Sequence, residues 1–228
     1  MKFTSTLIKG KLIKRYKRFF SDIKVNNRIV TAHCQNTGSM MGLLNEGNDV
    51  WLTKNEDPKR KLKFTLEIIK TNKSLIGVNT HRANRIVEDA LENKLINEFK
   101  KLKLIKPEFK FSKDTRFDFL CDKKIIEVKN VTLTRKNKIA EFPDAVTTRG
   151  TKHLIKLVDS INKKYDPYVL FLTQIQDIEY FRIANDIDYN YYENYLRAKK
   201  AGVNFLAYRC DLNSKEIKIE KKIKIIDE

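Results

Sequence analysis

The sequence contains little of what marks a secreted, fibrous or membrane-spanning chain. Its three cysteines, Cys34, Cys121 and Cys210, are too scattered for a disulfide framework or a Cys-x-x-Cys metal site. Seven glycines and four prolines exclude a collagen-like or linker-type composition. The longest apolar run, Tyr168–Leu172, is far too short to cross a bilayer. The first ten residues hold no apolar stretch typical of a secretory signal. We therefore expect a cytoplasmic globular protein with no membrane partner.

Acidic residues are also scarce relative to basic ones. The 228 residues include 47 Lys or Arg and 29 Asp or Glu, which gives a formal net charge of +18. Hydrophobic residues make up 41%, enough for a packed core in one or two domains. A basic chain of this kind makes nucleic acid the first partner to consider. The alternative is that abundant Lys, Asn and Ile reflect A/T-rich codons and that much of the charge is solvated surface.

Residues 1–80 form the first predicted domain, a five-stranded barrel of the OB type. Short β-rich runs alternate with turn signals, and no convincing helix separates them. A small barrel or sandwich is typical of this pattern. The part is also the more basic, with 16 Lys or Arg against 6 Asp or Glu. The expected strands are Leu7–Lys14, Arg28–Cys34, Asp49–Thr53, Leu62–Ile69 and Ser74–Asn79.

Residues 81–228 form the second predicted domain, a mixed sheet flanked by helices. Asn84 is the expected N-cap of a first helix, and Ala201-Gly202 ends a third. The continuous apolar run Tyr168–Thr173 predicts a central strand that is covered on both faces. Further strands are expected at Glu108–Phe111, Arg116–Cys121, Lys124–Leu133, Asn204–Cys210 and Lys215–Ile226, and helices at Thr151–Lys164 and Tyr189–Lys200.

The stretch from Arg116 to Lys129 carries the strongest chemical signal. Interpreted as a hairpin turning at Asp122-Lys123, it places Asp118 opposite Glu127. Two opposed carboxylates repel each other, and a bound cation would turn that repulsion into a binding site. Hard divalent ions such as Mg²⁺ take carboxylate oxygens together with water and substrate phosphate. Lys129 lies two residues from Glu127 on the same face, where it could orient a water or offset growing negative charge.

The rest of the hairpin is expected to alternate between two faces. Arg116, Leu120 and Ile125 share the face of the two carboxylates. Phe117, Phe119, Cys121, Ile126 and Val128 form the opposite, core-facing side. The alternative interpretation is an ordinary amphipathic hairpin in which Glu127 pairs with Lys129 or Arg116.

Several ordered segments resemble one known family over nearly the whole chain. They are AHCQNTGSM (32–40), Arg60–Leu62, VNT (78–80), ANRIVEDAL (83–91), RFDFL (116–120), IEVKNVTL (126–133) and FPDAVTTRGTKHL (142–154). In these segments the sequence resembles the sugar fermentation stimulation protein A family. Gln35 replaces the proline that the family usually carries after the cysteine.

The resemblance implies an N-terminal OB-like barrel and a C-terminal domain with the PD-(D/E)XK nuclease fold. It also implies sequence-nonspecific DNA binding and a historical assignment as a regulator of sugar (maltose) utilisation genes. Asp118, Glu127 and Lys129 then occupy the nuclease motif. Glu88, in the first helix, matches the acidic residue that many such nucleases place near the metal. A solvated glutamate is the alternative for Glu88.

Two further groups of basic residues are candidate nucleic-acid contacts. Arg149, Lys152 and His153 stand at the start of the second predicted helix, where phosphate is favoured. The alternative there is a basic exposed face. In the barrel, basic residues alternate with aromatic ones, as in OB-type nucleic-acid surfaces. A plain solvated edge strand is the alternative for them. The barrel candidates are Lys11, Lys14, Arg15, Lys17, Arg18, Arg60 and Lys61.

The sequence therefore predicts a nucleic-acid-binding protein with phosphodiesterase activity that depends on Mg²⁺ or Mn²⁺. Asp118, Glu127 and Glu88 are the predicted metal ligands, and Lys129 completes the catalytic set. DNA is the expected partner and RNA an alternative substrate. Oligomeric state is left open, with a homodimer as one option. A non-catalytic DNA-binding regulator is the alternative function.

Overall fold

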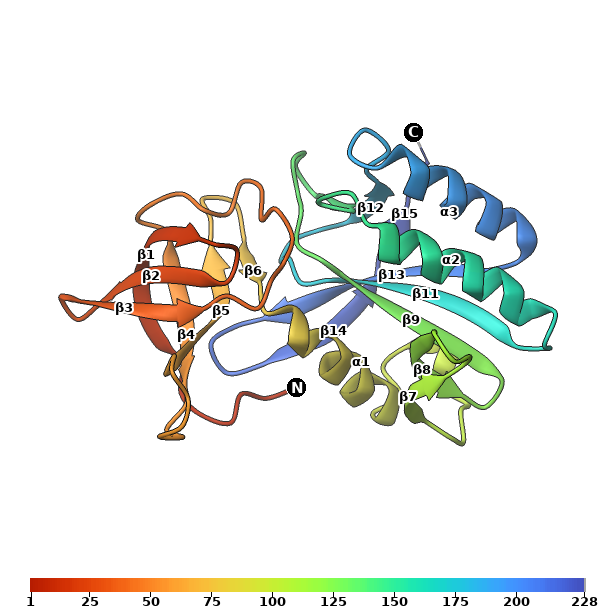
Figure 1. Ribbon diagram of the computed structural model, residues 1–228, viewed down its shortest axis with the longest axis horizontal. Helices are drawn as coiled ribbons and strands as arrows, with labels where there is room; N and C mark the ends of the chain where they lie inside the picture. The colour runs from red at the N-terminus through yellow and green to blue at the C-terminus, as the bar shows by residue number, and fades with distance from the viewer. Residues whose placement is uncertain (228) are drawn as a thin grey trace.

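The first domain is a closed barrel with one strand added to it. The structure is a computed structural model that describes residues 1–227. Antiparallel pairing sets the order β3-β2-β1-β4-β5, and a parallel contact between β3 and β5 closes the barrel (Figure 1). A short sixth strand continues from β5 towards the second domain. The strands are β1 (Ile8–Tyr16), β2 (Phe20–Val25), β3 (Arg28–His33), β4 (Asp49–Lys54), β5 (Phe64–Lys70) and β6 (Leu75–Gly77).

The barrel strand β2 is missing from the sequence prediction. It pairs with β1 through a hairpin whose turn residues Lys17 and Arg18 both have positive φ. Such turns favour glycine or asparagine, and this one contains neither. The predicted strand Ser74–Asn79 corresponds to the added strand β6, so β2 takes its place among the five barrel strands.

The second domain is built on a six-stranded mixed sheet. Its order is β14-β13-β11-β9-β8-β7, with parallel pairing of β11 to both β9 and β13. Helix α1 covers one face, and α2 and α3 cover the other (Figure 1). The sheet strands are β7 (Lys106–Lys110), β8 (Arg116–Cys121), β9 (Lys124–Val131), β11 (Asp166–Thr173), β13 (Asn204–Leu212) and β14 (Ile217–Lys222). The helices are α1 (Ala83–Glu92), α2 (Thr148–Ile161) and α3 (Tyr189–Ala201).

These elements confirm a barrel followed by a mixed sheet flanked by helices. The apolar run of β11 is buried on both faces, as expected of a central strand. All three cysteines are free and buried. The prediction missed a second, three-stranded sheet made of β10 (Ile139–Phe142), β12 (Tyr180–Ile183) and β15 (Lys224–Ile225). Its strands are only two to four residues long, too short to show a period.

The start of α1 also differs from the prediction. A short 3-10 helix, η1 (Thr80–Arg82), leads directly into it, so that Arg82 rather than Asn84 is the N-cap. Asn79 caps the 3-10 turn, with its side chain accepting from the amide of His81. Asn84 therefore lies inside the helix, where its side chain is available for another contact.

The two domains share part of their hydrophobic core. A single cluster of buried apolar side chains runs from Leu12 and Val50 in the barrel to Val169 and Phe171 in the second domain. The backbone N–H of Gly77 donates to the carbonyl of Gln174, and a Cβ on Gly77 would lie 2.4 Å from the Gln174 Oε1. The second domain thus packs directly against the barrel at a point where a side chain larger than that of glycine would displace the Gln174 side chain.

Within residues 1–227, no helix combines the length and the apolar character needed to span a bilayer.

Candidate active site and nucleic-acid interface

The hairpin of β8 and β9 has the predicted register at its turn. Phe119 pairs with Ile126, and Cys121 pairs with Lys124, around a turn that includes Asp122 at φ 54°. Regular pairing stops at Asp118, whose carboxylate accepts the N–H of Val128 at 2.7 Å. The carboxylate of Asp118 therefore binds the backbone of β9, and Asp118 is not paired directly with Glu127.

The prediction that the apolar residues of the hairpin share one core-facing side was wrong, and so was the alternative of a solvated opposite face, because helices cover both faces of the sheet. Ile125 is fully buried in the core beneath α2 and α3. Phe117 packs in the same core, whereas Phe119 and Cys121 pack beneath α1. Phe117 and Phe119 therefore pack into different parts of the core, although only one residue separates them in β8.

Asp118 is held between β9 and α1. Its second oxygen accepts a hydrogen bond from the Nδ2 of Asn84 at 2.7 Å. Burial and the nearby charge of Glu127 raise the pKa of Asp118 to about 6, against the lowering effects of its two hydrogen bonds and of Lys129. The carboxylate is thus poised for a cation that would favour its ionised form.

Glu127 lies in the middle of β9 and is only 3% exposed. Its Oε1 accepts from the Nζ of Lys129 at 2.7 Å and contacts the Nδ1 of His153. Burial opposes ionisation of Glu127, but Lys129 and His153 outweigh it and hold its pKa below the usual value. The other oxygen, Oε2, is buried and has no hydrogen-bond partner within residues 1–227.

His153 connects this carboxylate to α2. Thr147 is the N-cap of α2, with its side chain accepting from the amide of Gly150, and His153 faces the sheet from the second turn of the helix. Its ring packs edge-on against Phe117, and its Nε2 accepts a 3.5 Å contact from the Nε of Arg149. These contacts keep the imidazole beside Glu127, so His153 acts on the site through the carboxylate.

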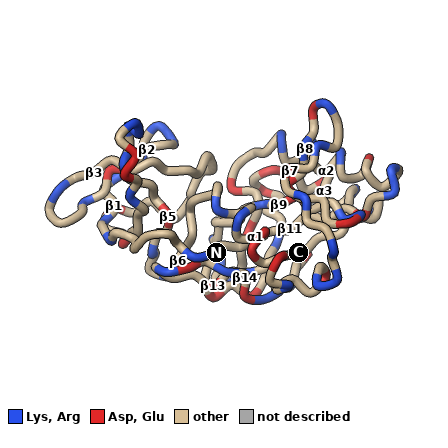
Figure 2. The backbone as a smooth tube through the Cα atoms, turned by 90° about the horizontal axis from the view of Figure 1, so that it is seen from below, with Lys and Arg blue, Asp and Glu red and all other residues tan. Residues whose placement is uncertain are grey.

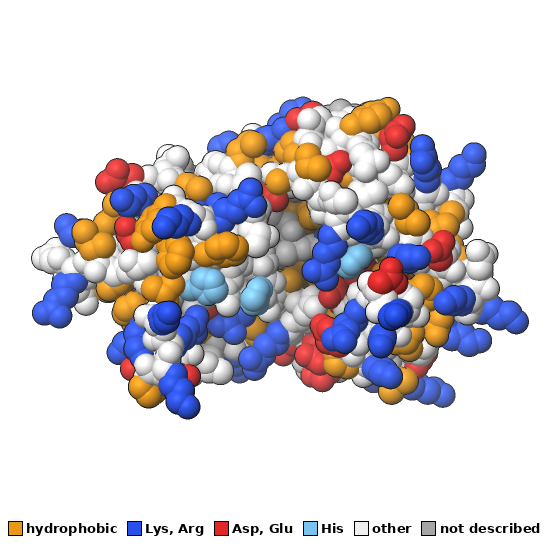
Figure 3. All heavy atoms as spheres, in the orientation of Figure 1, with side chains coloured by type: hydrophobic (Ala, Val, Ile, Leu, Met, Phe, Trp, Pro, Cys, Tyr) orange, Lys and Arg blue, Asp and Glu red, His pale blue; other side chains and the backbone are white. Residues whose placement is uncertain are grey.

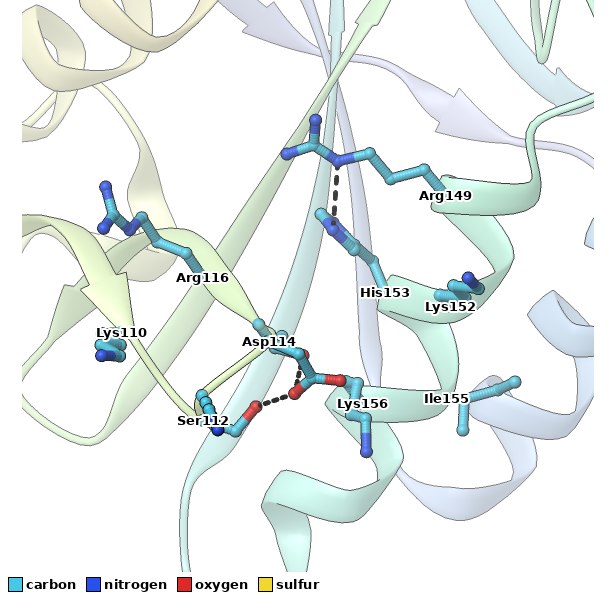
Figure 4. Close-up of a pocket in the computed structure, with 11 residues that line it drawn as sticks. Lys110, Ser112, Asp114, Arg116, Arg149, Lys152, His153, Ile155 and Lys156 are labelled. Atoms are coloured by element: carbon cyan, nitrogen blue, oxygen red, sulfur yellow. Dashed lines mark hydrogen bonds between the residues drawn. The ribbon is translucent and has the colours of Figure 1, made fainter.

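A basic cleft of about 730 Å³ opens beside His153. Figure 4 shows side chains from α2 on one side of it and from the β7–β8 connection on the other. The basic cleft is lined by Lys110, Lys113, Arg116, Arg149, Lys152 and Lys156, together with Ser112, Asp114, Thr115, His153 and Ile155. The three predicted residues of the second helix therefore all face one cavity, whose charge suits a phosphate group.

Glu88 is not brought into contact with this site. It lines a different hollow of about 840 Å³, beside Met1, Asp89 and Glu216. The α1 residue that touches Asp118 is Asn84, one turn earlier. Across residues 1–227, no group of three or more His, Cys, Asp or Glu side chains is arranged to hold a metal ion. The role of Glu88 as a metal ligand remains a prediction.

The basic residues predicted to contact nucleic acid around the β1–β2 hairpin differ in whether their side chains already have partners within the protein. Lys14, Lys17 and Arg18 are exposed, whereas Lys11 forms an ion pair with Asp49 at 2.7 Å. Arg15 donates to four backbone carbonyls, three of them in residues 36–39. Its guanidinium therefore holds that loop in place and has little capacity left for a ligand.

Arg60 and Lys61 lie in the connection before β5. Lys61 is exposed, while the Nη2 of Arg60 donates to the Thr65 hydroxyl at 2.8 Å.

Basic residues occur along both domains and not only in the barrel (Figure 2). Figure 3 shows histidine side chains on the barrel side and on the second-domain side of the same face.

Asp118 and Glu127 offer a suitable donor set for a hard divalent cation. Such ions take carboxylate oxygens and complete their shell with water. The unpartnered Oε2 of Glu127 is the observation that supports this fit, because a buried carboxylate oxygen is costly without a partner. Each oxygen of Asp118 accepts one hydrogen bond and keeps a further lone pair.

Replacing Asp118 with asparagine is expected to stabilise the metal-free protein by about 1–3 kcal/mol at pH 8. Because the folded pKa of about 6 exceeds the unfolded value, ionised Asp118 costs stability that increases as pH rises from 4 to 6. Asn84 can turn its amide to match the new side chain. Thermal unfolding in EDTA measures the difference in stability between the variant and the native protein, which should disappear near pH 4. An equal gap at both pH values would contradict the raised pKa.

Sequence reasoning missed two contacts of the site. Asn84 was interpreted as a helix cap, and His153 as a phosphate contact only. No local signal links His153 to Glu127, because 26 residues separate them and the contact depends on how α2 crosses the sheet. The i, i+4 spacing of Arg149 and His153 does indicate that these two share a helix face.

The architecture now defines a class of protein: an OB barrel joined to a mixed-sheet α/β domain that carries a buried carboxylate pair beside a basic cleft. Family models match both parts, the SfsA N-terminal OB domain over residues 13–78 and the Sugar fermentation stimulation protein RE domain over residues 81–216. The chain belongs to the sugar fermentation stimulation protein A family.

Relatives match along the whole chain. A sugar fermentation stimulation protein homolog of Pelagibacter ubique is 64% identical and covers 100% of both chains. One of Maricaulis maris is 38% identical and covers 99% of this chain and 98% of its own. A solved structure of Pyrococcus furiosus SfsA in complex with Ca²⁺ superposes with a TM-score of 0.88 at 21% identity, over 100% of this chain and 98% of that one.

Proposed function

We propose that this protein binds nucleic acid without sequence preference and hydrolyses phosphodiester bonds with Mg²⁺ or Mn²⁺. The observation that carries the proposal is the unpartnered Oε2 of Glu127, a buried carboxylate whose other oxygen contacts His153 at the wall of the basic cleft. A carboxylate pair, an ammonium and a basic cleft that can hold a phosphate backbone together form a minimal set for this reaction.

Each side chain has a separate task in the proposed reaction. Asp118 and Glu127 would hold the ion, which would polarise the phosphate and assist ionisation of the attacking water. Lys129, with its Nζ 2.7 Å from Glu127, would orient that water and offset the negative charge that grows on the phosphate. Arg116, Arg149 and Lys152 would hold the substrate backbone in the basic cleft.

The solved relative gives independent support for a divalent ion. The Pyrococcus furiosus protein was determined in complex with Ca²⁺, a hard cation that also prefers oxygen ligands. The same preference would direct Mg²⁺ or Mn²⁺ to the carboxylates of this chain.

The direct test is incubation of the purified protein with single- and double-stranded DNA and with RNA, in Mg²⁺, Mn²⁺ or EDTA. Cleavage in either metal, its absence in EDTA, and its loss in Asp118→Asn and Lys129→Ala would support the proposal. Asp177→Asn, at an exposed position in the connection between β11 and β12, is the matched control and should cleave normally. Absence of cleavage by the native protein, or equal cleavage by the variants, would overturn it.

The second candidate is a DNA-binding regulator without catalysis, linked to sugar utilisation. It is favoured by the placement of Glu88, because without it Asp118 and Glu127 are, within residues 1–227, the two acidic side chains next to Lys129. A regulator of this kind would bind DNA equally well in EDTA and in Mg²⁺ and would give no product. Both candidates require affinity to fall steeply as salt increases, because phosphate contacts dominate binding.

A further inference from the structure

The barrel has a polar pocket of its own. This barrel pocket has a volume of about 380 Å³ and lies where β4 and β5 meet η1, the segment that leads into the second domain. Hydroxyl, amide and charged side chains line it, including those of Thr53, Asn55, Arg60, Thr65, His81 and Arg82. No Phe, Tyr or Trp of residues 1–227 is among its lining residues, so stacking of a base is not its purpose.

The floor of the barrel pocket is a carboxylate that is already neutralised. Glu67 is fully buried, and Arg82 donates to both of its oxygens, at 2.7 and 3.1 Å. Asn79 and Thr53 add hydrogen bonds at 2.9 and 2.7 Å. With four donors on two oxygens, Glu67 has no capacity left for a cation, and its role is to hold Arg82 in place.

The rim of the barrel pocket carries positive charge that no acid offsets. Arg60 donates to the hydroxyl of Thr65, and no carboxylate within residues 1–227 pairs with it. His81 also has no acidic partner in this part of the chain. His33 lies beside them, and burial together with the charges of Arg60 and His81 lowers its pKa. The rim therefore attracts an anion.

A phosphate group with its adjoining sugar matches these features. Arginine fits phosphate oxygens well, and hydroxyl and amide groups suit the polar edge of a sugar. The volume of the barrel pocket is enough for one phosphate with its sugar but not for a much larger ligand. His81 lines the barrel pocket and His153 lines the basic cleft, and Figure 3 shows histidine side chains of both domains on one face. A strand that crosses this face could contact both cavities.

We propose that the barrel pocket is a second backbone-binding site, in which Arg60 and His81 hold a phosphate of the same strand that enters the basic cleft. The inference rests on the proposed function in that it requires nucleic acid as the ligand. It does not require cleavage. Its position in the barrel would fix the direction from which the strand reaches Glu127.

The test is binding of a fluorescein-labelled single strand in EDTA, where no cleavage occurs. Arg60→Ala should weaken binding about tenfold and reduce the slope of affinity against salt by about one. Lys59→Ala removes the same charge from an exposed neighbour outside the pocket, so its effect should be small. Equal losses in the two variants would overturn the proposal. Thermal unfolding of both variants checks that each is folded, and His81→Ala, which should also weaken binding, provides a second test at the rim.

Competition separates the sources of phosphate. A nucleoside monophosphate and inorganic phosphate should displace the strand only at far higher concentration than an unlabelled strand does. If the monophosphate binds as tightly as the strand and loses affinity in Arg60→Ala, the pocket serves a free nucleotide and the backbone assignment is wrong. Cleavage assays are read separately: a selective Arg60 effect without any cleavage would refute catalysis but retain this site.

Discussion

Glu127→Gln is expected to reduce metal-dependent cleavage by more than the roughly 10- to 100-fold loss typical of residues around a metal site. Glutamine keeps the shape of the side chain but removes the charge that would hold the ion and pair with Lys129. It also replaces one carboxylate oxygen with an amide that cannot ligate in the same way. Rates at saturating Mg²⁺ and Mn²⁺ measure the effect.

Two comparisons show whether that loss belongs to the site. Glu46→Gln makes the same change in an exposed barrel loop and should cleave like the native protein. His153→Ala should require more metal for half-maximal activity and lose about 10- to 100-fold in rate, because His153 holds Oε1 of Glu127. His153→Asn keeps a donor close to the position of Nδ1 and should recover part of it. Equal defects in Ala and Asn variants would contradict a positioning role.

Arg82→Ala is expected to cost about 3 kcal/mol of unfolding free energy, the lower end of the range for a broken buried ion pair. The change leaves the fully buried Glu67 with only Asn79 and Thr53 as donors. The lower end applies because the Arg82 side chain is 28% exposed, so water can reach part of the gap. Urea unfolding followed by circular dichroism measures the loss.

The partner substitution gives the control for this prediction. In Arg82→Ala/Glu67→Gln the buried charge is gone, so the double variant should be more stable than Arg82→Ala alone. Arg85→Ala removes an exposed arginine one turn further along α1 and should change stability by less than about 0.5 kcal/mol. A double variant less stable than the single one would show that Arg82 acts through packing and not through charge.

The sequence was sufficient for elements whose signal is local and long. The apolar run of β11, the amphipathic α2 and the β8–β9 turn all appear within a few residues of their predicted bounds. The hairpin between β1 and β2 was missed, because Lys17 and Arg18 form a turn that usually requires glycine or asparagine. The small sheet was missed because parallel pairing of short strands depends on tertiary contacts alone.

The candidate site also has parts that could be predicted from the sequence and parts that could not. Spacing along one hairpin was enough to bring Asp118, Glu127 and Lys129 together as hypotheses. It could not show that the β8–β9 ladder ends at Asp118, or that a histidine 26 residues away would contact Glu127. The sequence also could not show which basic side chains are exposed. Lys14 and Arg15 are neighbours in one basic segment, yet it is Arg15 that donates hydrogen bonds to the loop at 36–39.

The shared core has a consequence for how this chain folds and for how it can be divided. Leu12 and Phe171 belong to one apolar cluster, so neither domain has a complete interior without the other. A cut near residue 80 would expose Ile76 and Ile175, which now meet across the junction, to water. We therefore expect the barrel and the sheet to unfold together in one cooperative transition. In such a unit the distance between the barrel pocket and the basic cleft is set by the packing of the two domains.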